Sequence, residues 1–526
     1  MLMSYLSIVF ILFLIITTLL YYLLPDRIRW CILLLASSVF YLCAGYDKLL
    51  IVIVTSMVIW TASRAISRQY NRMEQEIAEQ ELRGKEKAAM LAKHKRKCRN
   101  FLLLPALCLV IGVLAYCKFA TMLEEALWNL FSYPISLEVI VPLGISYYTF
   151  SSVGYLLDVY WRKTKHISNY FRFLLCVLYF PQIVQGPIAR YNRLEKELFK
   201  EHTFDYKQVC FGMQLMLYGY AKKMILADRL ALYTSQVFGN LRSYEGLVVM
   251  IAVFASVFQL YMDFSGCMDI VCGASQIFGI PLDRNFQHPF FSTSTAEFWR
   301  RWHITLGTWF KDYVYMPVAV SKWLIKLITK IRNKFGKEPA KVVNTVIPLL
   351  IVWLLTGIWH GTGADYVLWG LYYGLIIICA TVFAGQYKRL ADILHVDMTT
   401  KSYRVFQMVR TFFVFAGGRL LTAPGSVSNT VMAVRQMFRS FNPWIFWDGT
   451  LYGMGLDYKD WCVVIIGLLI VRRVSILQEC GSVREMIASR NIVLRWLVYY
   501  GAFFAILIFG MYGPGYNASD FIYGNF

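Results

Sequence analysis

Long apolar stretches alternate with short basic segments along the whole chain. A helix crosses the hydrocarbon core of a bilayer with about 20 mostly apolar residues, and stretches near that length recur from end to end. The clearest are residues 5–24, 30–46, 49–63, 101–117, 137–160, 247–262, 343–359, 366–384, 459–471 and 493–512. Three further apolar segments, interrupted by proline, glycine or charge, cover 171–189, 207–227 and 404–421. The pattern predicts an all-α, polytopic integral membrane protein.

Composition and charge agree with this class. Of the 526 residues, 58% are hydrophobic and 16% are charged, whereas a soluble domain is about one quarter charged. Fifty-three Lys and Arg outweigh 32 Asp and Glu, but these bases fall between apolar runs rather than along one face. The positive-inside rule explains that placement, so no nucleic-acid partner is expected. No CxxC pair or Cys/His ligand spacing occurs, so no metal is expected either.

The basic segments predict the topology. Bases follow the first span, fill residues 64–99, follow the 137–160 span and precede the last span. With these segments in the cytoplasm, both the N-terminus and the C-terminal tail lie outside. The Glu-, Lys- and Ala-rich residues 68–100 then form a solvated cytoplasmic hairpin or helix, with partner binding as the alternative. The opening segment lacks a basic start and is too long for a cleaved signal.

Residues 259–317 are too polar for a lipid-facing span and too aromatic for a loop. Gln259 and Asp263 share a helical face, and ionisable groups at membrane depth normally face a cavity or a partner. Gly279–Pro281 and His288–Pro289 are expected to break the helix. Beyond them Ser294 or Thr295 is expected to cap a new helix, with Glu297 completing a capping box.

That new helix is predicted to carry a histidine. At spacings of four and seven residues, Trp299, His303 and Leu306 fall on one side, while Arg300 and Arg301 project elsewhere. His303 is a candidate site residue, with a hydrogen-bonded interfacial histidine as the alternative. For the tryptophans nearby, Trp302 among them, the alternative is anchoring at the membrane interface.

Three other places depart from ordinary membrane helix. In LTGIWHG (355–361) a span ends at His360, which follows Trp359 and is either functional or part of a stabilising His–carboxylate pair. In FPQIVQGPIAR (180–190) two prolines and two glutamines, Gln185 included, predict a broken or re-entrant helix that lines a cavity, or a tight interfacial turn. The tail after Gly513 ends in FIYGNF; it either packs on the bundle or carries Tyr523 into a site.

Taken in order, these motifs resemble the membrane-bound O-acyltransferase family. The likeness is to the bacterial branch of alginate O-acetyltransferases and teichoic-acid D-alanyltransferases. It rests on VPLGISYYTF (141–150), FPQIVQGPIARY (180–191), FQLYMDFSG (258–266), NFQHPF (285–290), FWRRWHITLGTWFKDYVYMP (298–317), LTGIWHG (355–361), VLWGLYYG (367–374) and the terminal FIYGNF. The resemblance implies a ring of roughly ten to thirteen helices around a central funnel.

The resemblance also implies a domain organisation. Residues 1–136 would be N-terminal transmembrane helices that include the cytoplasmic basic hairpin, about 64–100. Residues 137–425 would be the catalytic core, 426–512 further transmembrane helices, and 513–526 an extracellular aromatic tail. A bacterial cytoplasmic membrane is the implied location.

By resemblance, His360 is the catalytic base, His303 the second histidine and Tyr523 an acyl carrier. Candidate substrate-binding residues are Asn285, Arg300, Arg301, Trp302, Lys311, Asp263, Trp359 and Gln185. The basic members suit nucleotide phosphates, although interfacial snorkelling explains them equally well. The implied reaction moves an acetyl group from a cytoplasmic thioester, acetyl-CoA, to an extracellular cell-wall or exopolysaccharide polymer.

That reaction would use an acyl-tyrosine relay and an extracytoplasmic partner acyltransferase, without a permanently bound cofactor. Two alternatives stay open. One is a D-alanyltransferase for teichoic acid that takes its acyl group from a carrier protein. The other is a transporter of polysaccharide or lipid-linked sugar, which would also bury histidines and carboxylates.

Overall fold

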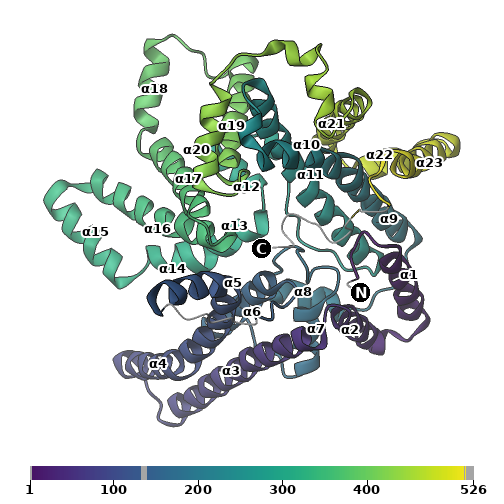
Figure 1. Ribbon diagram of the computed structural model, residues 1–526. Coiled ribbons are helices and arrows are strands. Elements are labelled where there is room, and N and C mark those ends of the chain that lie inside the picture. Colours follow the sequence, from purple (N-terminus) through teal and green to yellow (C-terminus); the bar gives the residue numbers. More distant parts are fainter. Residues whose placement is uncertain (1–2, 132–138, 514–515, 517–526) are drawn as a thin grey trace. The chain divides into compact units, whose positions relative to one another are not determined.

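The computed structural model describes residues 3–131, 139–513 and 516, and Figure 1 shows the order of their helices. Within these residues the regular elements are helical, apart from an isolated bridge between Phe286 and Trp302. The predicted all-α class is therefore confirmed. The described chain divides into two compact units, one built from Met1–Met213 and Val271–Asp283 and the other from Gln214–Ile270 and Arg284–Asn517.

Helices of the first unit follow one another with short connections. They are α1 (Ile8–Leu23), α2 (Asp26–Leu42), α3 (Tyr46–Glu79), α4 (Gly84–Cys98), η1 (Arg99–Leu103), α5 (Leu104–Phe131), α6 (Ile145–Tyr160), α7 (Tyr170–Leu178) and α8 (Tyr191–Leu198). Two helices, α9 (Tyr206–Tyr220) and α11 (Leu247–Ile277), run through the boundary between the units.

The second unit contains the remaining helices. They are η2 (Ala221–Ala227), α10 (Asp228–Gly239), η3 (Leu241–Ser243), η4 (Pro289–Phe291), α12 (Thr295–Arg301), α13 (Ile304–Phe310), η5 (Lys311–Tyr315), α14 (Met316–Ala319), α15 (Lys322–Phe335), α16 (Lys337–His360), α17 (Ala364–Val382), α18 (Ala384–Ile393), α19 (Lys401–Thr422), α20 (Val427–Met437), η6 (Pro443–Phe446), η7 (Thr450–Gly453), α21 (Tyr458–Cys480), α22 (Val483–Ala488) and α23 (Ile492–Phe509).

Among the described residues, six helical stretches are long and apolar enough to cross a membrane. They are Tyr46–Glu79, Gly84–Glu124, Leu247–Ile277, Lys337–His360, Ala364–Val382 and Ile492–Phe509. Each overlaps one of the spans predicted from hydropathy. The first two predicted spans form the shorter helices α1 and α2, of 16 and 17 residues.

Charged residues 64–100 lie in two helices, the second half of α3 and all of α4, that are joined by a turn. Helix α3 is 34 residues long, or about 51 Å at 1.5 Å per residue, whereas the hydrocarbon core is about 30 Å thick. Its charged second half therefore extends past the apolar layer. Glu81 takes a positive φ of 47°, the chain turns, and α4 leads back into the apolar helix α5.

A glycine fixes the start of α6 in the first unit. Gly144 has a φ of 65°, and a Cβ atom there would lie 1.6 Å from the carbonyl oxygen of Ile183. The segment that contains Ile183 is also anchored near the N-terminus of the chain, because the Tyr5 hydroxyl donates to the carbonyl of Phe180 at 2.7 Å. Aromatic rings of Phe10, Phe13 and Phe180 pack around this bond. The FPQIVQGP segment is thus a buried turn, not a lipid-facing helix.

Helices α16 and α17 lie side by side in the second unit (Figure 1) and meet through glycine. A Cβ at Gly357 would lie 2.4 Å from the carbonyl oxygen of Tyr366, and one at Gly370 would lie 2.4 Å from that of Trp353. The two backbones therefore touch near the end of α16. This contact determines where α16 presents its last residue, His360.

Candidate functional site

The chain breaks its helix at His303. Helix α12 ends at Arg301, Trp302 is extended, and His303 has a left-handed backbone with φ 46° and ψ 51° before α13 begins. The expectation of one helix with Trp299, His303 and Leu306 on a common face is therefore wrong. The reason is a competing backbone pairing: Ile304 donates to the carbonyl of Asn285 at 3.0 Å, and residues 286 and 302 form the isolated bridge.

Of the two expected cap residues, Ser294 is the one that caps α12. Its hydroxyl accepts from the backbone N–H of Glu297 at 3.2 Å. The Glu297 carboxylate reaches back to Thr293, one residue earlier than a standard capping box requires, and accepts from its N–H at 2.9 Å. Burial raises the pKa of Glu297, but these hydrogen bonds and the charge of Arg301 outweigh it, so that the pKa lies below its ordinary value.

Asn285 holds His303 by a side-chain hydrogen bond. The Asn285 Oδ1 atom accepts from the backbone N–H and the hydroxyl of Thr305, at 3.1 and 2.9 Å, and lies 3.1 Å from Nδ1 of His303. Because a backbone N–H can only donate, this contact identifies the atom as the amide oxygen. The His303 Nδ1 atom must then carry its proton, and the neutral ring keeps its lone pair on Nε2.

Burial also determines whether the imidazole ring of His303 is charged. His303 lies between two short helices, outside the six candidate spans, and is 2% exposed. Burial lowers the pKa of His303 to about 3, because an imidazolium loses its hydration there. At neutral pH the residue is uncharged, and its Nε2 atom accepts rather than donates a hydrogen bond.

Trp359 links the two candidate histidines. Its ring centroid lies 6.0 Å from that of His303 and 4.7 Å from that of His360. His360 also packs against Trp369, at 4.8 Å between ring centroids. His360 ends α16 and is 5% exposed. The structure therefore brings His303, Trp359 and His360 into one aromatic cluster.

Trp302 belongs to the core behind this cluster. It is 2% exposed and its ring stacks on Phe298 at 5.5 Å, with Phe286 and Phe415 each at 5.0 Å. It is not at the surface, so interfacial anchoring does not describe it. Packing of this kind holds α12 in place next to His303.

The three basic candidates differ in their surroundings. Arg301 is paired with Glu297 at 2.8 Å and with Glu479 at 3.5 Å. Arg300 and Lys311 have exposed side chains. These two are therefore better placed than Arg301 to meet an anionic ligand.

Asp263 is paired with a lysine that was not among the residues predicted from the sequence. Its Oδ1 atom lies 2.5 Å from Nζ of Lys223, and both side chains are buried. The signal was present in the chain, because Lys222 and Lys223 interrupt the apolar segment 207–227, where ionisable residues need partners.

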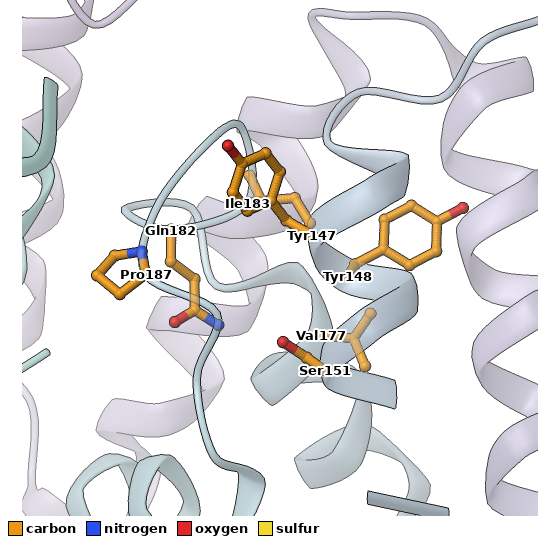
Figure 2. Close-up of a pocket in the computed structure, with 7 residues that line it drawn as sticks. All are labelled: Tyr147, Tyr148, Ser151, Val177, Gln182, Ile183 and Pro187. Atoms are coloured by element: carbon orange, nitrogen blue, oxygen red, sulfur yellow. The ribbon is translucent and has the colours of Figure 1, made fainter. Parts of the chain in front are cut away.

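Gln185 lies in the first unit and is fully buried. Neither its amide oxygen nor its amide nitrogen has a hydrogen-bond partner among the described residues. Close by in the chain, Gln182 and Pro187 line a cavity of about 10 Å³ with Tyr147 and Tyr148 of α6 (Figure 2). That is room for about one water molecule. Tyr523, the remaining candidate, lies outside the described residues.

Comparison with known proteins identifies the family. A family model described as MBOAT, membrane-bound O-acyltransferase, matches residues 102–329. A probable alginate O-acetylase of Pseudomonas syringae pv. tomato is 29% identical over 447 residues, which are 84% of this chain and 73% of that protein. A peptidoglycan O-acetyltransferase of Helicobacter pylori is 28% identical over 295 residues, 51% of this chain and 52% of the relative.

A teichoic acid D-alanyltransferase of Bacillus subtilis is 30% identical over 249 residues, 47% of this chain and 60% of that protein. The matched residues 102–329 include Asn285 and the helix break at His303. The helical membrane architecture and these similarities agree: the chain belongs to the membrane-bound O-acyltransferase family, whose members are acyl-transferring enzymes of the membrane.

Proposed function

We propose that this enzyme takes an acetyl group from acetyl-CoA in the cytoplasm and delivers it to a polysaccharide outside a bacterial cytoplasmic membrane. Two of the relatives are named for O-acetylation of alginate and of peptidoglycan, which supports acetyl as the group and a polymer as the final acceptor. Membership of an enzyme family favours this activity over the transporter that the sequence left open.

The observation that carries the proposal is the pair of buried imidazoles that both lie next to Trp359. Acyl transfer from a thioester needs a base that takes a proton from the attacking oxygen. We assign that role to His360. His303, with its lone pair on Nε2, accepts a hydrogen bond from a substrate N–H or O–H and so helps to orient the donor.

The first acceptor in this proposal is Tyr523. Its phenolic oxygen attacks the acetyl carbon while the phenolic proton passes to His360. The carbon–sulfur bond then breaks, and the leaving thiolate takes the proton back from the imidazolium. The products are an acetyl ester on Tyr523 and free coenzyme A. A partner acyltransferase outside the membrane then moves the acetyl group to the polymer.

Mass spectrometry of the peptide that contains Tyr523, after incubation with labelled acetyl-CoA, tests this sequence of steps. We expect label on the wild-type peptide and none on Tyr523→Phe, which keeps the ring and removes the nucleophile. His360→Ala should slow labelling by about 10²–10⁴-fold, the usual contribution of a general base, while the protein still folds. Polymer acetylation by Tyr523→Phe at the normal rate would exclude the relay.

The similarity to a teichoic acid D-alanyltransferase favours one second candidate, D-alanyl transfer from a carrier protein. The two donors are separable by ligand stabilisation. A donor present at 100 times its Kd raises the free energy of unfolding by about 2.7 kcal/mol. Acetyl-CoA alone should raise the unfolding temperature if the acetyltransferase assignment is correct, and an aminoacylated carrier protein alone should do so if it is wrong.

A further inference from the structure

A cluster of charges joins η2 to α11 in the second unit; its lysines and Asp263 are buried, and Asp228 and Asp269 are half-buried. Lys223 lies 2.5 Å from Asp263 and 2.8 Å from Asp228, and Lys222 lies 2.6 Å from Asp269. Asp263 and Asp228 thus share the single ammonium group of Lys223, whereas Asp269 has Lys222 and also lies near the charge of Arg484. In an apolar environment the excess negative charge needs a further hydrogen-bond donor.

The local backbone explains why two adjacent lysines reach different partners. Residues 221–227 form a π-helical segment, η2, which is wider than an α-helix. Just before it, Gly219 lies so close to α11 that a Cβ atom would be 2.6 Å from the carbonyl oxygen of Gly266. The close approach brings both lysine side chains within reach of the carboxylates on α11.

The chain after α23 returns to this cluster. The backbone N–H of Met511 donates to the carbonyl of Met224, within η2, at 2.9 Å. The hydroxyl of Tyr516 donates to Oδ2 of Asp228 at 2.8 Å. The other oxygen of Asp228 faces Lys223. Asp228 therefore connects the buried charges to the start of the C-terminal tail.

We propose that Asp228 is the docking point of the C-terminal tail and that Tyr516 is the positioning residue that binds there. A phenol suits the place because it donates a hydrogen bond to the excess carboxylate without adding charge. Tyr523 follows seven residues later, within about 25 Å of extended chain. Docking at Tyr516 therefore limits the volume that Tyr523 explores, which raises its effective concentration at the site. This inference rests on the proposed tyrosine relay.

Comparing acylation of the protein's own tail with acylation of an added peptide separates positioning from catalysis. The test variant is Tyr516→Phe. The matched control is Tyr512→Phe, because the Tyr512 hydroxyl donates to the carbonyl of Leu507 on α23 and not to a residue of the charge cluster. Full-length protein in detergent is given labelled acetyl-CoA, first alone and then with a synthetic peptide of residues 517–526.

We expect Tyr516→Phe to label its own Tyr523 at least tenfold more slowly than wild type and to label the peptide within twofold of the wild-type rate. Tyr512→Phe should match wild type in both assays. Unchanged labelling of Tyr523 in Tyr516→Phe would overturn the proposal. An equal loss in both assays would overturn it as well, because it would place Tyr516 in the structure of the site rather than in tail docking.

Hydrogen exchange distinguishes failure of this inference from failure of the relay. If wild-type Tyr523 takes no label, the relay is wrong, but the docking contact still makes a prediction. Amide exchange of residues 511–526 should then be at least tenfold faster in Tyr516→Phe than in wild type and Tyr512→Phe. Equal exchange rates in the three proteins would reject the docking contact itself.

Discussion

The chemical form of His303 depends on a residue 18 positions earlier in the chain. The amide oxygen of Asn285 is oriented by Thr305, and it leaves His303 one choice of tautomer. A histidine with a free choice of tautomer would offer either a donor or an acceptor at Nε2. The Asn285 contact together with burial makes it a neutral acceptor.

This burial predicts a pH dependence of stability. The pKa of His303 is about 3 in the folded protein and 6.5 for the free side chain. Between these values the unfolded chain binds the extra proton, so acid favours unfolding. We expect the free energy of unfolding of wild type to fall below pH 6.5 more steeply than that of His303→Gln, the difference approaching about 1.4 kcal/mol per pH unit.

Denaturant unfolding in detergent at several pH values between 5 and 7.5, followed by tryptophan fluorescence, measures this difference. At pH 7.5 the two proteins should show no difference in slope, since His303 is neutral in both states. Parallel pH profiles throughout the range would mean that His303 is hydrated in the folded protein.

At the level of elements, the contact between α16 and α17 holds His360 in place. Gly357 and Gly370 lie where the two backbones meet, and each faces a carbonyl oxygen of the other helix. Small residues permit such an approach between membrane helices. The motif glycines near His360 therefore act through packing and not through chain flexibility.

Gly370→Ala tests this contact. The new methyl group would lie 2.4 Å from the carbonyl oxygen of Trp353, so the helices must separate, at a cost of about 1–3 kcal/mol. We expect a lower unfolding temperature together with a loss of acyl transfer, because His360 moves with α16. Gly501→Ala on α23 is the control, since nothing lies within 4 Å of its added Cβ. Equal behaviour of the two variants would show that the helices accommodate the methyl group.

On the scale of the whole molecule, exposed apolar surface defines the lipid-facing helices. Only 6% of the 18 residues in the apolar stretch of α23 are buried within the protein, so the side chains of this helix are expected to contact lipid. In the apolar stretch of α11, by contrast, 67% of the residues are buried within the protein. The apolar spans thus divide into lipid-facing helices and core helices, and hydropathy alone does not distinguish the two kinds.

The predicted topology is testable with reporter fusions. Bases concentrated in the α3–α4 hairpin should keep it in the cytoplasm, and the tail after Gly513 should lie outside. In a bacterial host, we expect alkaline phosphatase fused after Leu82 to be inactive and the same enzyme fused after Gly513 to be active. A fluorescent protein should give the opposite pattern. Phosphatase activity at the hairpin would invert the topology, and with it the side on which Tyr523 acts.

Membrane class, the main spans and the cap at Ser294 follow from the sequence, because hydropathy and capping act within about one helix length. The same local reasoning continued α12 through His303, where it was wrong. Residues 285–287 pair there with the backbone of residues 301–304, and no local propensity indicates such a partner.

Local pattern thus established that this is a helical membrane protein with histidines in unusual places, since transfer to lipid is a property of consecutive residues. Tertiary structure decided the rest: the left-handed turn at His303, its tautomer, the pairing of Lys223 with Asp263, and the return of Tyr516 to Asp228. Each depends on groups that are far apart in the chain, and their interaction exists once packing brings them within hydrogen-bonding distance.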